Sequence, residues 1–592
     1  MEKMARIVSF KIPEDGRIDK NQRLIPDSIG DKDQRFFYWL ILLGILLFAA
    51  FLRLYRIQDY MTFLGDEGRD ALVVYGILHG KFTLLGPTAS VGGFFLGPIY
   101  YYFTTPFLWL FNYNPVGSSV MVALFGTATV FLVYKIGSEF FGRRVGLMSA
   151  FLYSIAPLVI AHSRSSWNPN LVPFFSLLTL YLVYKAVNKN KAKLFILSGI
   201  LLGITMQLHY LATFVGVIIG VYVFFSKCHA ELDSASKKIR ISKSEIRNNS
   251  QNSNFQILKT KFLDFWLLRF VSNFVLRTSK DYLYIFLGFL VGWSPFLAFE
   301  VRHGFPNIQS IISFVFTSGD TGKVDNFSLT VYDVFFRLFG RLVTNFPPPE
   351  QVSLGIHPNI AFWYYATLAL AVVSALLLAQ RFIVSLNNKE QFQKISLMVL
   401  WLVIGIGLFG FYKKSIYDYY FGFMFPLPFI LVGITLKVLY SNFHELTRIK
   451  LTGKILAIVI SVVLVLINLK GMPFLFPPNK QLAQVEKISR FVLDKSEGKP
   501  FNFALISRGN SDHAYRYFFT LWDSRPVTIE NPQKDPERKT ATDQLLVVCE
   551  TSPCGVLGHS LWEVAGFGRA EIVDEWNVSV VKVFKLKHYE GK

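Results

Sequence analysis

Four charged side chains lie within five residues of one another: Asp66, Glu67, Arg69 and Asp70. They follow a long apolar run, in the sequence GDEGRDA. On a helix that starts near Asp66, Arg69 and Asp70 share its face, because residues three and four apart are neighbours. The helix dipole favours a carboxylate there, so Asp66 can be read as a simple N-cap. A cap leaves Glu67 unexplained, and the cluster favours a functional site whose carboxylates bind a polar ligand or accept a proton.

A second polar cluster occurs in the turn AHSRSSWNPNL. It combines cations, an aromatic ring and an amide, which suit an anionic, sugar-bearing ligand. Its candidate residues are His162, Arg164, Trp167 and Asn168. Two further candidate cations near predicted helix ends are Arg302 and Lys414. Each single cation has an alternative interpretation as a side chain that extends to the membrane surface.

Aromatic residues gather in three further stretches. The segment 87–103 combines glycine pairs with aromatic residues, among them Tyr101. Flexible backbone beside ring faces suits a site that admits a lipid and a sugar, and an amphipathic surface segment is an equal alternative. His209 and Tyr210 are candidates at the end of a predicted span. An aromatic belt at the membrane surface is the favoured interpretation of three tyrosines: Tyr417, Tyr419 and Tyr420.

The composition indicates the elements that must position these residues. The 592 residues are 52% hydrophobic and only 17% charged, which is typical of a polytopic membrane protein. A membrane-crossing helix needs about 20 apolar residues. Eleven such spans are predicted, at 36–55, 115–135, 145–161, 170–187, 193–208, 210–226, 282–299, 361–380, 395–411, 420–440 and 453–470. The first is too long and too far from the start to be a cleaved signal peptide.

The basic residues predict an orientation. The formal charge is +21, and Lys and Arg accumulate in cytoplasmic loops. Nucleic-acid binding is not expected, because no recognition motif accompanies the charge. With a cytoplasmic N-terminal segment 1–35, most basic turns fall on one side, including a basic insert at 227–281. Spans five and six could instead form one kinked helix, which would invert the chain after them. Residues 97–112 are expected to form an interfacial helix.

The C-terminal part, 471–592, changes character and is expected to be a small extracytoplasmic α/β domain. An amphipathic helix is predicted at 480–495, and strands at FNFALIS, PVTIE, DQLLVVCE and NVSVVKVFKL. Cys549 and Cys554 can form a local disulfide outside the cytoplasm, and two free thiols are an equal alternative. The sequence contains no metal-ligand cluster of standard spacing, so we expect neither a metal nor another cofactor.

Together, the acidic pair after the first span, the helix behind it, the HSRSSWNPN turn and the C-terminal part resemble the GT-C-fold glycosyltransferases. The similarity is to the branch of dolichyl-phosphate-mannose protein mannosyltransferases and the lipid A aminoarabinose transferase. It covers the transmembrane part, 36–470, and is most specific in GDEGRDA and its continuation LLGPTASVGGFFLGPIYYY. The insert at 227–281 departs from the usual short cytoplasmic loop. The fold class implied is a polytopic helical membrane protein with interfacial helices and a small C-terminal α/β domain.

The resemblance implies an activity and residue roles. Such enzymes pass a sugar, with inversion, from a polyprenyl-phosphate carrier to a lipid, glycan or protein acceptor on the extracytoplasmic face of the membrane. Asp66 would be the general base, and Glu67 would orient it or bind the acceptor. Arg164 would hold the donor phosphate, followed in preference by His162, Arg302 and Lys414. Residues for the sugar and acceptor would be Arg69, Asp70, Tyr101, Trp167, Asn168, His209 and Tyr210, although Arg69 could instead pair with Asp66 or Asp70.

Two other classes of function compete with this interpretation. A transporter or flippase of lipid-linked sugars would have repeated halves and charges near the middle of the membrane. The candidate residues here lie at span ends instead. A non-catalytic membrane scaffold would require nothing special at Asp66. Within the enzymes, an oligosaccharide polymerase or ligase would carry its motif in a large late outer loop.

Overall fold

The computed structural model describes residues 31–247, 277–353, 355–442 and 450–591. The expected cytoplasmic segment 1–35 and the middle of the insert therefore lie mostly outside the described residues. The chain divides into two units, Met1–Gly44 and Ile45–Lys592. The described part of the first unit is the start of helix α1 (Asp31–Leu54). The fold and the site below belong to the second unit.

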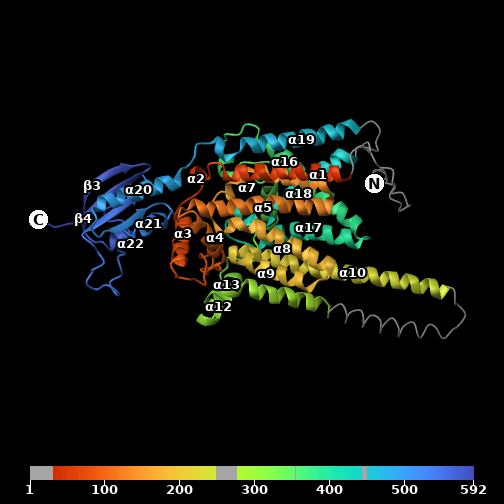
Figure 1. Ribbon diagram of the computed structural model, residues 1–592, viewed down its shortest axis with the longest axis horizontal. Helices are drawn as coiled ribbons and strands as arrows, with labels where there is room; N and C mark the ends of the chain where they lie inside the picture. The colour runs from red at the N-terminus through yellow and green to blue at the C-terminus, as the bar shows by residue number, and fades with distance from the viewer. Residues whose placement is uncertain (1–30, 248–276, 354, 443–449, 592) are drawn as a thin grey trace. The chain divides into compact units, whose positions relative to one another are not determined.

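The described residues contain seven helices that are long and apolar enough to cross a membrane (Figure 1). These are α1, α5 (Val116–Phe141), α8 (Val172–Lys189), α10 (Thr213–Arg247), α16 (Ile360–Ser385), α17 (Lys389–Gly407) and α19 (Lys450–Lys470). Two bent pairs raise the number of possible spans to nine. They are the helix Arg277–Gly292 with α12 (Ser294–His303), and η4 (Asp418–Met424) with α18 (Pro426–Asn442). The protein is thus a multi-pass helical membrane protein, as predicted.

The remaining two predicted spans also coincide with helices, but they are interrupted or short. The span at 145–161 is divided into α6 (Arg143–Ile155) and α7 (Pro157–His162) at Ala156, whose backbone is extended. Proline disfavours the helical conformation in the residue before it, which explains the break. The span at 193–208 is α9 (Ala192–Leu208), an apolar helix of 17 residues. Spans five and six are separate helices, because His209 has extended backbone between them.

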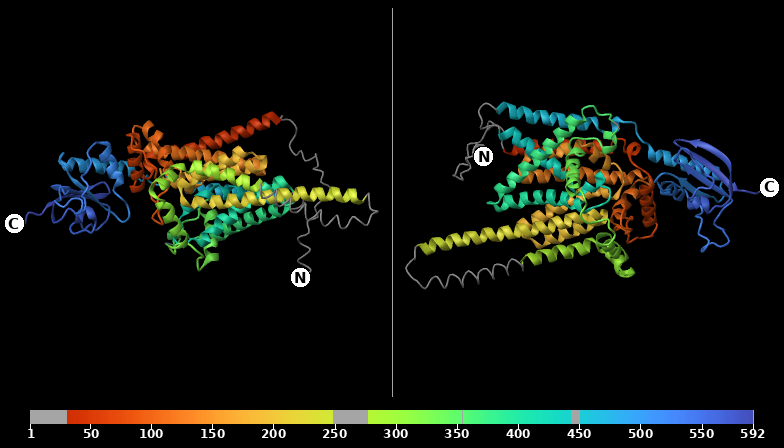
Figure 2. Two further views of the ribbon diagram at one scale, coloured as in Figure 1. Left: turned by 90° about the horizontal axis from the view of Figure 1, so that it is seen from below. Right: turned by 180° about the vertical axis from the view of Figure 1, so that it is seen from behind.

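The basic insert is partly helical. The helix predicted to end at residue 226 continues as α10 to Arg247. The chain returns in the helix Arg277–Gly292, and the two run side by side in every view (Figure 2). A hydrogen bond of 2.6 Å from the Tyr282 hydroxyl to the Gly220 carbonyl joins them.

Short helices occupy one end of the helical part, which we call the Asp66 end. They are α2 (Ile57–Tyr60), α3 (Gly65–Leu78) and α4 (Ile99–Leu110). In Figure 1, α3 lies across the direction of the long helices. The helix predicted to start near Asp66 and the one predicted at 97–112 are confirmed as helices. The opposite end, which we call the Lys227 end, holds contacts between predicted cytoplasmic turns, such as that from Asn188 to Gln393 (3.2 Å).

The C-terminal part contains a four-stranded sheet in the order β1-β2-β4-β3. Its strands are β1 (Asn502–Ile506), β2 (Gln544–Cys549), β3 (Ala570–Val578) and β4 (Val581–His588). Strands β1 and β2 are parallel, and the other pairs are antiparallel. Helices α20 (Gln481–Ser496) and α21 (His513–Leu521) pack on one face of the sheet, and α22 (Trp562–Ala565) packs on the other. Every residue of β1 and β2 is buried, because both faces are covered.

Two of the four predicted strands need correction. PVTIE forms no strand and is not part of the sheet, and Val527 only donates to the Phe501 carbonyl at 2.8 Å. Proline removes one backbone donor from this segment. The predicted strand NVSVVKVFKL contains the turn between β3 and β4, where Ser579 has φ 57°. The remaining strands and the helix at 480–495 are confirmed.

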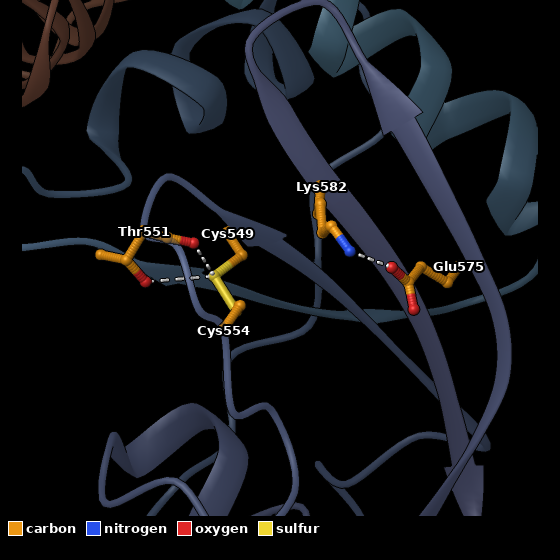
Figure 3. The surroundings of a disulfide bond; sticks show 5 residues. All are labelled: Cys549, Thr551, Cys554, Glu575 and Lys582. Carbon is orange, nitrogen blue, oxygen red and sulfur yellow. Dashed lines mark hydrogen bonds and ion pairs between the residues drawn. A yellow bond between two sulfur atoms is a disulfide. The ribbon is translucent and has the colours of Figure 1, made fainter.

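A disulfide joins Cys549 and Cys554, so the disulfide alternative is the one that the structure contains (Figure 3). It closes a short loop directly after β2. The Cys549 sulfur also lies 3.4 Å from the Thr551 hydroxyl. Lys582 and Glu575 form an ion pair of 2.5 Å nearby, across β3 and β4.

Candidate functional site

Helix α3 presents its three carboxylates differently. The helix begins at Gly65, with Leu64 as its N-cap residue, so the interpretation of Asp66 as the cap is wrong. The Glu67 carboxylate is buried and accepts the Leu64 N–H at 3.0 Å. Asp70 is also buried, whereas the Asp66 side chain is 56% exposed. Asp66 is therefore the one carboxylate of the three that an external ligand can reach.

Arg69 holds the carboxylates of α3 in place. Its guanidinium contacts Asp66 at 2.8 Å and Asp70 at 2.7 Å. A second hydrogen bond of 3.0 Å runs from Arg69 Nε to Asp70. The buried Asp70 thereby fixes the guanidinium, and the guanidinium fixes the exposed Asp66. Of the two roles predicted for Arg69, the pairing with Asp66 and Asp70 is the one that this geometry matches. Arg69 positions the Asp66 carboxylate.

Burial changes the protonation of the two inner acids. It raises the pKa of Glu67 to about 7, against a smaller opposing effect of the hydrogen bond from Leu64. It also raises the pKa of Asp70 to about 6, although Arg69 opposes the shift. A buried carboxyl loses hydration when it ionises, which is the cause in both cases. The two inner acids thus carry a proton at a higher pH than ordinary carboxyl groups do.

These pKa values predict how stability changes with pH. When folding raises the pKa of an acid, that acid stabilises the folded state less and less as the pH rises from the pKa in the unfolded chain to the pKa in the folded protein. For Glu67 that interval runs from about 4.5 to about 7. The Glu67→Gln variant keeps an acceptor for the Leu64 N–H but does not ionise. We expect its melting temperature, relative to that of the original protein, to be higher at pH 8 than at pH 5. An equal difference at both pH values would contradict the raised pKa.

The C-terminal part packs directly against α3. The Gly65 N–H donates to the Asn510 side-chain oxygen at 2.9 Å. The contact requires glycine, because a Cβ at Gly65 would lie 2.1 Å from the Ser511 hydroxyl. A Cβ at Gly68 would lie 2.3 Å from the Ala514 backbone nitrogen. The start of α21 therefore lies against the acidic helix with no room for a side chain between them.

This contact brings polar groups that the sequence analysis missed. The Ser511 hydroxyl and His513 Nδ1 are 2.7 Å apart. Burial lowers the pKa of His513, and the charges of Asp66 and Arg69 also act on it, which places the imidazole beside them. A polar run, SRGNSDHAYR, between a strand and a helix is the signal in the sequence. It did not reveal the partner, since the contact joins segments more than 400 residues apart.

The turn at 162–171 requires a correction. Arg164 was expected to bind a phosphate, but its side chain is buried and donates to the carbonyls of Leu52 (2.8 Å) and Tyr55 (2.6 Å). Asn168 is buried too, and its amide donates to the Leu208 carbonyl at 2.6 Å. The last carbonyls of a helix lack partners within it. These two side chains supply donors at the ends of α1 and α9, so neither is placed to bind a ligand.

The other predicted residues are distributed over the Asp66 end. Trp167 and Tyr419 have ring centroids 4.5 Å apart, and His209 stacks on Tyr210 at 4.6 Å. The hydroxyls of Tyr210 and Tyr412 are 3.0 Å apart. These residues form an aromatic cluster that the structure does bring together. The remaining four predicted site residues lie outside this cluster. His162 is half-buried near Phe425, and Tyr101 is buried beside the Arg69–Asp70 pair. Arg302 is exposed at the end of α12, and Lys414 forms an ion pair of 2.9 Å with Asp320.

Two arginines that the sequence analysis passed over form a cationic cluster. Arg337, in α14 (Phe327–Gly340), contacts Asp418 at 2.6 Å, and Arg341 contacts the same carboxylate at 2.7 Å. Two cations thus share one half-buried acid, and the exposed Asp333 is a further partner of Arg337 at 3.2 Å. The spacing RLFGR places both arginines on one side of a helix, and this is the signal that could have revealed them.

Arg341 also lines a cavity of about 1160 Å³ between α16, α18 and α19. The walls are largely apolar and include Leu370, Val463 and Ile467. The polar lining is at the Asp66 end, with Arg341, His357 and Lys470. The Nε2 atom of His357 is buried and has no hydrogen-bond partner among the described residues. Such a cavity fits a long apolar chain with an anionic group at its polar end.

A hydrogen bond connects the lining of this cavity with the segment before the acidic helix. Phe476 lines the cavity, and its carbonyl accepts the Tyr60 hydroxyl at 2.8 Å. Tyr60 belongs to α2, directly before the segment that leads into α3. Asp66 itself does not line the cavity. Within the described residues, no group of three or more His, Cys, Asp and Glu side chains is arranged to hold a metal ion.

Comparison with known proteins agrees with this architecture. Residues 96–240 match the sequence model of the dolichyl-phosphate-mannose-protein mannosyltransferase family. The Bacillus subtilis (strain 168) protein YkcB, described as a candidate mannosyltransferase, is 26% identical over 155 residues. That alignment covers 26% of this chain and 21% of YkcB, so the chain spans about a fifth of that relative's length.

The solved structure of ArnT extends the similarity beyond this segment. ArnT from Cupriavidus metallidurans, bound to undecaprenyl phosphate, is similar with a TM-score of 0.52 and 12% identity, over 94% of this chain and 98% of ArnT. The oligosaccharyltransferase AglB from Archaeoglobus fulgidus, in complex with an inhibitory peptide and a dolichol-phosphate, gives a TM-score of 0.48 and 12% identity, over 87% of this chain and 69% of AglB. The chain therefore has the GT-C fold of ArnT, and its residues 96–240 match the mannosyltransferase family model.

Proposed function

We propose that the protein transfers a sugar from a polyprenyl-phosphate carrier to an acceptor at the extracytoplasmic face of the cell membrane. The observation that carries this proposal is the exposed carboxylate of Asp66, held by Arg69 at the same end as a cavity with apolar walls and a cationic rim. The mannosyltransferase match and the polyprenyl phosphate bound by ArnT support it. A transporter is less favoured, since the charged residues of the proposed site lie at one end of the helices and not at mid-membrane.

In the proposed reaction, Asp66 removes the proton from the acceptor hydroxyl as its oxygen attacks the anomeric carbon. The new bond forms as the bond from that carbon to the phosphate oxygen breaks, which inverts the configuration. The polyprenyl phosphate leaves with the bonding electrons. Glu67 contributes by fixing the start of α3, and Arg69 orients Asp66. The charge that develops on the leaving phosphate needs cations close by.

For the donor, we propose that the apolar cavity holds the lipid chain and that Arg341, His357 and Lys470 face its phosphate. This replaces Arg164 as the first phosphate ligand. Arg341 and Arg337 share Asp418, and the exposed Asp333 also pairs with Arg337, so both guanidinium groups are held in place before the donor binds. The aromatic cluster around Trp167 and Tyr419 offers ring faces to a sugar. His513 lies beside Asp66, where we propose that the acceptor binds.

The basic test is sugar transfer by the purified full-length protein. A polyprenyl-phosphate hexose with a labelled sugar should lose its label to an acceptor or to water, and release of polyprenyl phosphate should match it. A panel of lipid-linked sugars, with products read by mass spectrometry, identifies the donor. Movement of the intact lipid-linked sugar between membrane leaflets without cleavage would support a flippase instead.

The lipid cavity gives a matched pair of variants. Val463 lines it, whereas the adjacent Val462, which is similarly exposed, does not. We expect Val463→Trp to raise the KM for the lipid-linked donor about tenfold, because the indole fills space that the lipid chain needs. Val462→Trp should leave KM within about twofold of the original value, since surface changes usually cost little. Equal KM values for the two variants would exclude this cavity as the donor site.

A further inference from the structure

A second polar cavity lies at the Lys227 end, away from the proposed reaction. It has a volume of about 220 Å³ and lies between the C-terminal end of α8, helix α10, the helix Arg277–Gly292 and the start of α17. Its lining is mostly polar, in a part of the protein where membrane helices end. The residues that matter below are Asn190, Ser226, Lys227, Arg277, Thr278 and Lys389.

The cavity contains a buried cation with a fixed position. Lys227 Nζ contacts the Asp281 carboxylate at 2.6 Å and the Asn190 side-chain oxygen at 2.8 Å. Both members of the ion pair are largely buried. Arg277 at the rim pairs with Glu231 at 3.2 Å, but its side chain is 71% exposed, and exposed ion pairs are weak. Lys389, also at the rim, is exposed.

One buried hydroxyl of the lining, that of Thr278, has no hydrogen-bond partner in the described part of the chain. Thr278 is 5% exposed. Ser226 is fully buried, but its hydroxyl lies near that of Tyr222. A buried hydroxyl without a partner is costly, and most such groups in folded proteins are satisfied. The Thr278 hydroxyl can donate a hydrogen bond to a ligand in the cavity.

The surrounding charge favours an anion. Lys227, Arg277 and Lys389 face two acids, Asp281 and Glu231, each of which is already paired. Helix α17 begins at Lys389, so the positive end of its dipole adds to the three cations. A phosphate group supplies several acceptor oxygens, which match a hydroxyl donor and cations of this kind.

We propose that this cavity binds a phosphate group, either that of an anionic phospholipid or free inorganic phosphate. The site is independent of the proposed transferase reaction and lies at the opposite end of the helices. Its position where several membrane helices end suits a lipid headgroup, because anionic lipids are attracted to basic groups beside a membrane span. A lipid bound there would tie α8, α10, α17 and the returning helix together.

The test uses the full-length protein, stripped of lipid in a neutral detergent. One arm adds inorganic phosphate, and a second adds phosphatidylglycerol, with phosphatidylcholine, whose phosphate is neutralised by its own choline, as the comparison without net charge. Melting temperature measures stabilisation, and native mass spectrometry counts bound lipid. We expect phosphatidylglycerol, but not phosphatidylcholine, to bind and to raise the melting temperature. A response to phosphate alone would identify free phosphate as the ligand.

Thr278→Val is the decisive variant, because it removes the unpartnered hydroxyl and keeps the side-chain shape. Without ligand, its melting temperature should equal or exceed that of the original protein, which shows that it folds. Its affinity for the phosphate ligand should fall about tenfold, as expected for one lost hydrogen bond to a charged group. Lys193→Gln, on an exposed part of α9 at the same end, is the control and should not change affinity. Equal affinity in Thr278→Val and the original protein, or no response to either ligand, would overturn the proposal.

Discussion

The Asp66→Asn variant is expected to lose transfer activity by roughly a hundredfold to ten-thousandfold, which is the usual contribution of a general base. Asparagine keeps the size of the side chain and an oxygen that can accept the 2.8 Å hydrogen bond from Arg69. It cannot take the proton from the acceptor. The loss should therefore appear in kcat, with the KM for the lipid-linked donor nearly unchanged, because the donor cavity does not include Asp66.

Asp59→Asn is a matched control for this experiment. Asp59 is another partly exposed carboxylate at the same end, and it also pairs with an arginine, Arg56, at 2.8 Å. It belongs to α2 and precedes the acidic helix by six residues. Transfer in Asp59→Asn should stay within about twofold of the original rate, as for most surface changes. Normal turnover in Asp66→Asn, or an equal loss in both variants, would remove the support for Asp66 as the base.

The elements of the fold could be predicted because each depends on local sequence. Apolar runs of suitable length coincide with helices throughout the helical part, and the break before Pro157 follows from the geometry of proline. The acidic helix was also visible, since Asp66, Arg69 and Asp70 have helical spacing. The turn inside NVSVVKVFKL was not predicted, because valines, which favour strands, flank it on both sides and Ser579 reverses the chain without a glycine.

The individual roles of site residues depended on contacts that a single sequence does not contain. Arg164 and Lys470 are both cations near span ends, yet one is buried against carbonyls of α1 and the other faces a cavity. The partner of a buried arginine is decided by where a distant helix ends. Glu67 and Asp66 are likewise neighbours in sequence, but helix geometry turns one inward and the other outward.

The contact between α3 and α21 leads to the second large expected effect. We infer that the C-terminal part forms the acceptor side of the site, because Asn510, Ser511 and His513 lie against the start of α3. In Gly68→Ala, the new Cβ would lie 2.3 Å from the Ala514 nitrogen and 2.4 Å from its Cα. These are backbone atoms and cannot rotate away as a side chain can. The start of α21 must therefore move away from the acidic helix.

We expect Gly68→Ala to lower kcat/KM for the acceptor at least tenfold, since displacements of about 1 Å can cost a hundredfold in rate. The KM for the lipid-linked donor and the slow transfer of sugar to water should persist, because neither needs α21. Gly76→Ala is the control on the same helix, where the new Cβ meets only the Lys81 side chain at 3.7 Å. If Gly68→Ala lost donor binding and acceptor transfer together at an unchanged melting temperature, the two substrates would share one surface. Acceptor kinetics equal to those of Gly76→Ala would show instead that the C-terminal part has no role in recognising the acceptor.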